Sequence, residues 1–120
     1  MESILKSIKQ LLGIDEAETS FDVDIIIHIN SAFADLHQMG VGPDEPFSIN
    51  DDDITWDAFT EENAIFNSVK TYVYLKVKLI FDPPANSSVL SAMERQAREL
   101  EWRLTVSASN KAMEENEEDE

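Results

Sequence analysis

Apolar residues recur at helical spacing along residues 22–39, and this pattern restricts the fold of the chain more than any other feature. One stripe contains Ile25, Ile29, Ala32, Leu36 and Met39. Spacing of three and four residues is typical of an amphipathic helix that buries one face. Asp22 suits the N-cap of this helix and Gly40 ends it. Such a helix needs further apolar surfaces to cover its stripe.

Three other segments are expected to supply those surfaces, at residues 2–12, 61–82 and 88–109. The last segment has a narrow seam in steps of three and four: Leu90, Met93, Ala97, Leu100 and Leu104. Residues 61–82 are ambiguous, because their apolar side chains also alternate as in a strand. We predict a helix there, since the apolar pattern is long for a strand, and Pro83-Pro84 ends it.

Residues 41–59 have a different character, with helix breakers at Gly42-Pro43 and Glu45-Pro46. Two short alternating runs, 47–49 and 54–56, predict a small β-hairpin or a long ordered loop. A lone hairpin is marginally stable, so it needs a surface from its own chain or from a neighbouring one. The sequence therefore predicts an all-α protein: a small four-helix bundle with a hairpin-like loop excursion between helices 2 and 3.

Acidic residues dominate the charge of the 120-residue chain, which is −16 at pH 7. Residues 1–67 contain 15 acids and 2 bases, residues 68–113 contain 7 bases and 4 acids, and residues 114–120 contain 6 acids. We expect one domain over residues 1–112 and a disordered acidic C-terminal tail over 113–120, because no apolar residue follows Met113. Binding to nucleic acid through phosphate neutralisation is not expected of such a chain.

The sequence contains no complete motif for catalysis or metal binding. The chain has no cysteine, and its three glycines form no phosphate-binding loop. An EF-hand loop that starts at Asp51 places Trp56 where the sharp turn requires glycine. His28 and His37 are nine residues apart, so they lie about 180° apart on a helix and cannot share a metal. We expect no catalytic, cofactor-binding or metal-binding residues, no enzyme activity and no membrane span.

Aromatic residues beside the acidic loop and off the last seam are either core fillers or anchors of a protein–protein interface, where Trp, Tyr and Arg concentrate. The candidate subunit or partner contacts are Phe47, Ile49, Trp56, Phe59, Trp102 and Arg103. We predict that the excursion 47–59 packs on an adjacent subunit or protrudes towards a channel.

Four strings resemble the head–tail connector proteins of long-tailed bacteriophages. They are FDVDIIIHINSAF (21–33), LHQMGVGP (36–43), VKTYVYLKVKLIFDPP (69–84) and ELEWRL (99–104). The Phe47–Trp56–Phe59 stretch is similar to the aromatic-punctuated loop of that family, and the resemblance covers residues 1–108. It also favours a helix over a strand for residues 62–82.

The resemblance implies a structural virion protein without enzyme activity or cofactors. It implies a homo-oligomeric, dodecameric ring that docks below the portal protein, extends the DNA channel and contacts the next neck or tail component. Assembly would take place in the host cytoplasm, from a chain that is monomeric or already oligomeric in solution. DNA would pass without specific binding, since a lumen lined with carboxylates repels phosphates.

A different class of function also fits the acidic residues 1–67: a small DNA-mimic or anti-restriction protein that occupies a host DNA-binding enzyme. The excess of bases in residues 68–113 argues against a mimic that uses the whole molecule.

Overall fold

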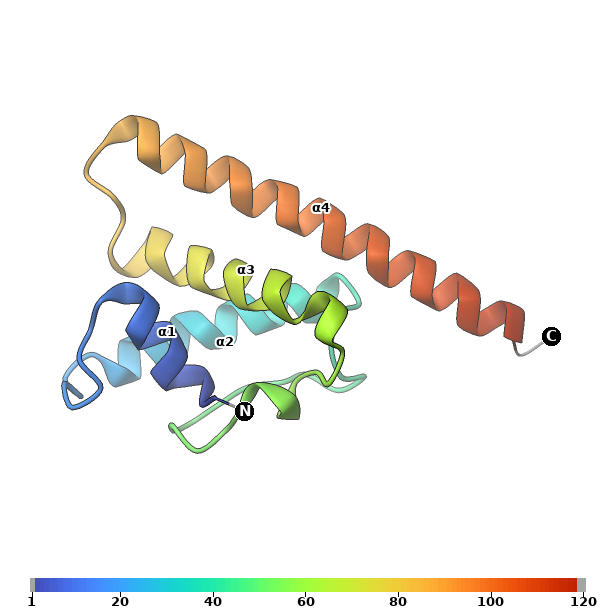
Figure 1. Cartoon of the computed structure of the whole chain (residues 1–120), viewed down its shortest axis with the longest axis horizontal. Coiled ribbons are helices and arrows are strands. Elements are labelled where there is room, and N and C mark those ends of the chain that lie inside the picture. Colours follow the sequence, from blue (N-terminus) through green and yellow to red (C-terminus); the bar gives the residue numbers. More distant parts are fainter. Residues whose placement is uncertain (1, 119–120) are drawn as a thin grey trace.

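Four α-helices form the fold in the computed structural model, which describes residues 2–118 (Figure 1). They are α1 (Ile4–Leu12), α2 (Asp22–Gln38), α3 (Asn63–Phe81) and α4 (Ser87–Glu118), with a short 3₁₀ turn, η1 (Trp56–Ala58), between α2 and α3. Within residues 2–118 there is no strand, and one isolated antiparallel bridge joins Ser3 to Thr55. The predicted all-α, four-helix architecture is confirmed, and the excursion is an ordered loop rather than a hairpin.

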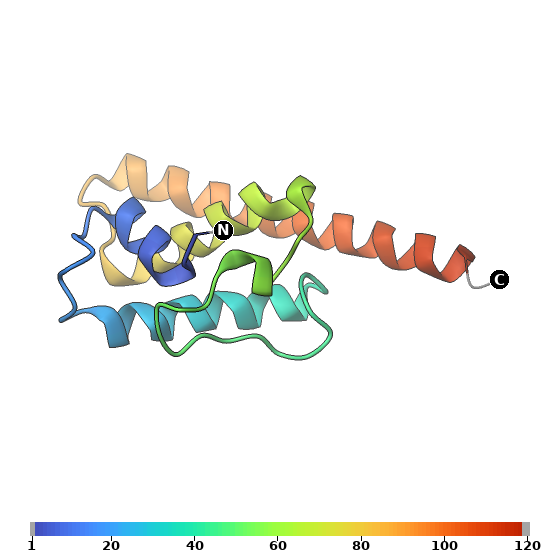
Figure 2. The ribbon, with the colours of Figure 1, turned by 60° about the horizontal axis from the view of Figure 1, so that its bottom comes forward.

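Helix α3 lies at the centre and packs against the other three helices. Figure 2 shows α4 and α2 as outer layers, with α1 and α3 between them. Val73 and Val77 of α3 are buried, and so is Leu75, which points about 160° away around the helix. A helix covered on two sides needs apolar residues on both, so its sequence also reads as an alternating strand. This explains the ambiguity of residues 61–82.

The helix ends follow local chemistry, although not always at the residues expected. Ser3 caps α1 by accepting a hydrogen bond from the Lys6 N–H at 3.3 Å, and Gly13 ends it in a left-handed conformation with φ 79°. Asp22 is not the N-cap of α2, since Phe21 takes that position without a side-chain cap. For α4, Oδ1 of Asn86 accepts hydrogen bonds from the backbone N–H groups of Ser88 and Val89.

The last helix is longer than expected. We expected it to end near residue 109 and residues 113–120 to be disordered, whereas α4 continues to Glu118. Residues 119–120 lie outside the described part of the chain. Glutamate is a good helix former, and extending a helix already held by packing needs no new nucleation, so strong charge alone does not end it. The C-terminal part of α4 extends beyond the other helices in Figures 1 and 2.

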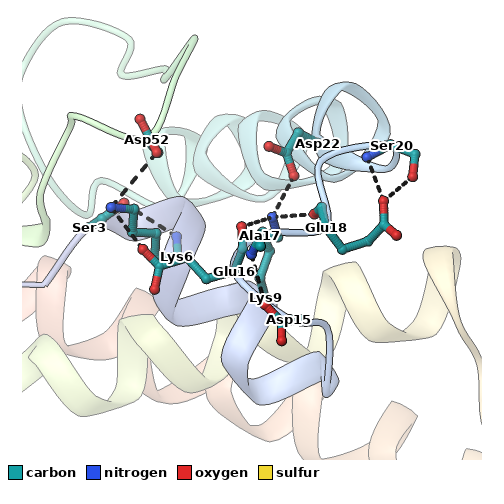
Figure 3. A network of polar contacts seen from close by, with 10 residues as sticks. All are labelled: Ser3, Lys6, Lys9, Asp15, Glu16, Ala17, Glu18, Ser20, Asp22 and Asp52. Atoms are coloured by element: carbon teal, nitrogen blue, oxygen red, sulfur yellow. Dashed lines mark hydrogen bonds and ion pairs between the residues drawn. The ribbon is translucent and has the colours of Figure 1, made fainter.

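A buried ion pair joins α1 to the start of α2 (Figure 3). The Lys9 side chain is only 3% exposed, and its Nζ lies 2.8 Å from Oδ1 of Asp22. Nζ also donates hydrogen bonds to the carbonyl oxygens of Glu16 at 3.2 Å and Glu18 at 2.6 Å. A buried ammonium is tolerated only when oxygens surround it in this way. The pair therefore holds the loop 13–21 against both helices.

Candidate docking surfaces

The loop between α2 and α3 is fastened to its own chain at two places. The Ile4 N–H donates to the carbonyl oxygen of Ile54 at 3.0 Å, beside the bridge between residues 3 and 55. Further along, the Asn30 side chain of α2 donates to the Ile49 carbonyl at 2.9 Å and accepts from the Ile49 N–H at 2.8 Å. An amide side chain can satisfy a peptide group in this paired manner, so the loop has a defined position without a neighbouring strand.

Trp56 is the centre of this attachment and is completely buried, at 0% exposure. Its Nε1–H donates to the Ser7 hydroxyl of α1 at 2.8 Å, and that hydroxyl donates to the Ile4 carbonyl at 3.0 Å. The ring also lies 6.1 Å, centroid to centroid, from the ring of Phe33. The indole nitrogen therefore has a hydrogen-bond acceptor, and the indole ring has an aromatic neighbour, within the same chain.

The other aromatic residues of the loop surround the same point. Phe33 of α2 lies 4.8 Å from Phe47 and 4.9 Å from Phe59, ring centroid to ring centroid. Ile49 and Phe59 are buried and Phe47 is half-buried. These contacts favour the core-filler alternative for the four side chains, and packing of residues 47–59 on an adjacent subunit or towards a channel stays a prediction. The loop buries its apolar residues in its own core because α1 and α2 offer both apolar cover and polar partners.

Trp102 and Arg103 have the opposite environment, since both are exposed on α4 and Trp102 is 69% exposed. Leu100 and Leu104 are buried, and Trp102 points about 160° away from each of them around the helix. Beside it is a shallow hollow of about 380 Å³, whose lining is Arg95, Arg98, Glu99, Trp102 and Arg103. This surface is named the α4 patch below.

The α4 patch contains basic side chains without acidic partners. Seven of the nine bases lie within 4 Å of a carboxylate: Lys6, Lys9, Lys70, Lys76, Lys78, Arg103 and Lys111. Among the side chains described, those of residues 2–115, no carboxylate lies within that distance of Arg95 or Arg98. Ion pairing thus neutralises the lysines of α3 and leaves free positive charge beside the exposed tryptophan.

A second hollow of about 450 Å³ lies between α4 and the two ends of the long loop. Val41, Phe59 and Leu104 contribute apolar surface, and an ion pair between Lys111 and Glu62 lies at its edge. The hydrogen bond and charge of Glu62 raise the pKa of Lys111 above its ordinary value. Gly42 is required here, because its φ is +99° and a Cβ atom would meet the Phe59 ring at 2.4 Å.

A polar contact joins the three larger helices. The Tyr72 hydroxyl of α3 lies 3.0 Å from Oε1 of Glu101 on α4 and 3.4 Å from Oδ2 of Asp35 on α2. Burial and the two carboxylates raise the pKa of Tyr72 above its ordinary value, because both disfavour a phenolate. Lys76 lies 3.6 Å from the same Asp35 oxygen. This arrangement holds the helices together and presents no reactive group.

The remaining pKa changes belong to surface groups of the loops. The hydroxyl and the backbone N–H of Ser20 donate hydrogen bonds to the Glu18 carboxylate and lower the pKa of Glu18. The Thr55 hydroxyl donates to the Asp57 carboxylate and lowers the pKa of Asp57 in the same way. The pKa of Lys6 is raised by Glu16 and, less strongly, by Asp52, which are drawn in Figure 3. These shifts follow from simple hydrogen bonds and ion pairs.

Among the described side chains of residues 2–115, no three or more His, Asp or Glu residues are grouped so that they could hold a metal ion. Within residues 2–118, none of the helices is both apolar enough and long enough to cross a membrane. The features described are a single packed body, a loop fastened to it and an exposed aromatic–basic helix face. They define a helical interaction module.

The model of the phage connector protein family matches residues 4–111, and the chain belongs to this family. Membership indicates a structural role in joining head and tail rather than an enzymatic one, and places the protein in the phage particle, in contact with portal and tail components. No curated protein and no solved structure matches the chain.

Proposed function

We propose that this chain assembles into a closed, dodecameric ring below the portal protein and extends the DNA channel. Residues 1–112 act as one connecting domain, and the ring presents a surface to the next neck or tail component. The observation that supports this proposal is the family match over residues 4–111, which spans nearly the whole helical body. Trp102 and Arg103 are the candidate contacts that remain accessible for assembly.

The charge distribution supports a role beside DNA without adhesion to it. Lys70, Lys76 and Lys78 of α3 lie 2.8–3.6 Å from the carboxylates of Glu2, Asp35 and Asp82. The bases of α3 therefore add little attraction for phosphates, and the net charge of −16 repels them. A ring whose lumen is lined with carboxylates lets DNA slide through.

The test uses phage particles made without this protein. We expect DNA-filled heads and free tails to accumulate, and the added full-length chain to restore joined particles, counted by electron microscopy. The chain bound at the neck is then located by cryo-electron microscopy. Heads and tails that join without the chain contradict the connecting role. A lumen lined by Lys70, Lys76 and Lys78, with the acids outside, contradicts the proposed charge arrangement. Capture of a host DNA-binding enzyme without binding to portal particles favours the DNA-mimic alternative.

A further inference from the structure

The α4 patch has the composition of an interface centre that lacks its partner. Trp102 is exposed, and Arg95 and Arg98 lie within about 40° of it around the helix, one to two turns before it. Tryptophan and arginine dominate the energetics of protein interfaces because they combine apolar area with directed hydrogen bonds. No described carboxylate neutralises these two arginines, so the patch attracts an acidic partner.

The outer face of α2 has the complementary composition. Val23 is 71% exposed and Ile27 is 55% exposed, one turn apart on the side that faces away from the buried stripe. Asp24 is exposed between them in sequence, and the loop that leads into α2 contains two further exposed acids without an ion pair, Asp15 and Glu18. This set, named the α2 face, combines two exposed apolar side chains with exposed acids that lie near them in the sequence.

We infer that the α4 patch of one copy of this chain docks on the α2 face of the next copy. Trp102 covers Val23 and Ile27, and Arg95 and Arg98 meet the acidic side chains near the start of α2. The inference deepens the proposed ring, on which it rests, by naming the two surfaces that touch.

The position of the two surfaces in the fold supports a head-to-tail contact. Helices α4 and α2 form opposite outer layers in Figure 2, so each copy offers one surface on either side. A contact between two different surfaces continues from copy to copy and closes into a ring, or extends into a filament. A symmetric contact between two α4 patches would bring like-charged arginines together, which opposes it.

Two single variants of the full-length chain test the inference. Trp102→Glu places a carboxylate against the acidic α2 face, and Ile27→Arg places a guanidinium against the α4 patch. We expect each variant alone to self-associate at least about thirty-fold more weakly than the wild type in sedimentation equilibrium, because each disrupts one side of every contact. An equimolar mixture regains association, since the intact α2 face of the first variant docks on the intact α4 patch of the second.

Matched controls lie on the same helices. Gln96→Glu changes an exposed residue of α4 about 120° from Trp102, and Gln38→Arg changes an exposed residue at the other end of α2. Both are expected to self-associate like the wild type. Circular dichroism checks that all four variants keep their helices.

Several outcomes overturn the inference. Normal self-association of Ile27→Arg with loss in Trp102→Glu indicates a symmetric α4 contact. A mixture that stays monomeric excludes the head-to-tail pairing. A wild-type chain that is monomeric both in solution and on portal particles also overturns it. Rings formed on portal particles by Trp102→Glu overturn the inference and leave the proposed function intact, whereas heads and tails that join without the chain refute the function itself.

Discussion

The two tryptophans provide a direct test of the structure, because one is buried and the other is exposed. Trp56 is completely buried, and a buried aromatic side chain of this kind removes about 150–250 Å² from water. At about 25 cal/mol per Å², this area corresponds to about 4–6 kcal/mol of transfer free energy. Measured losses for Trp→Ala changes in cores are about 3–5 kcal/mol, because the site partly relaxes.

We therefore expect Trp56→Ala to lower the free energy of unfolding by about 4 kcal/mol, a large share of the about 5–15 kcal/mol of a typical domain. The hydrogen bond from Nε1 to the Ser7 hydroxyl is lost as well, so the loop loses its attachment to α1. Trp102→Ala is the matched control. At 69% exposure, Trp102 should change the unfolding free energy by no more than about 0.5 kcal/mol.

The assay is urea unfolding followed by far-ultraviolet circular dichroism. If Trp56→Ala does not fold, Trp56→Phe keeps much of the ring but loses the Nε1 donor, and about 1–2 kcal/mol of stability should be lost. Equal losses for Trp56→Ala and Trp102→Ala refute the reasoning, as does a loss below about 1 kcal/mol for Trp56→Ala. Loss of ring assembly with unchanged stability in Trp56→Ala would restore the view that Trp56 is an interface anchor.

Three further changes test the packing of the fold. Lys9→Met leaves the Asp22 carboxylate without its buried ammonium, so we expect a loss of about 3–5 kcal/mol in urea unfolding, partly recovered in Lys9→Met with Asp22→Asn. Tyr72→Phe should lose about 1–2 kcal/mol at neutral pH. Because the pKa of Tyr72 is raised in the folded state, its contribution is complete below its ordinary pKa of about 10 and is lost as the pH rises further, so the stability gap between wild type and Tyr72→Phe narrows in alkaline unfolding experiments. Gly42→Ala should lower the melting temperature more than Gly13→Ala, since both glycines have positive φ but only the first has a side chain in the way.

Each of these expectations has an outcome that contradicts it. Full stability in Lys9→Met would show that the ammonium does not stabilise the loop 13–21. A stability gap for Tyr72→Phe that stays constant above pH 10 would show that the two carboxylates do not disfavour the phenolate. Equal melting temperatures for the two glycine variants would show that the Phe59 ring moves aside without cost.

Most of the helical architecture could be predicted from local sequence patterns. The stripe of α2 and the seam of α4 lie at spacings that only a helix places on one face, and Gly13 and Pro83-Pro84 mark helix ends by their backbone restrictions. The exact first residues of the helices were harder to predict, since Asp22 is the first helical residue of α2 rather than its N-cap, and its carboxylate pairs with Lys9. Periodicity also failed to separate helix from strand in α3, because a central helix is apolar on two sides.

The sequence predicted only in part which candidate contacts are buried and which are exposed. Trp56 and Trp102 both have charged neighbours in the sequence. Neither spacing nor composition therefore predicts which of the two is buried. The burial of Trp56 depends on Ser7, 49 residues away, and on the fit of the loop against α1 and α2. Trp102 stays exposed because it points away from the seam that binds α3.

Helical structure and strong acidity can be read from the residue order, because they depend on local spacing and on residue counts, and four sequence strings carry the resemblance to phage connector proteins. Which charged and aromatic side chains remain exposed and unpaired follows from the packing of the helices and the loop. The loop packs its aromatic residues inside, and ion pairs engage seven of the nine bases, five of them with carboxylates at least ten residues away in the chain. Such pairs depend on distances between separate elements, which the order of residues does not reveal.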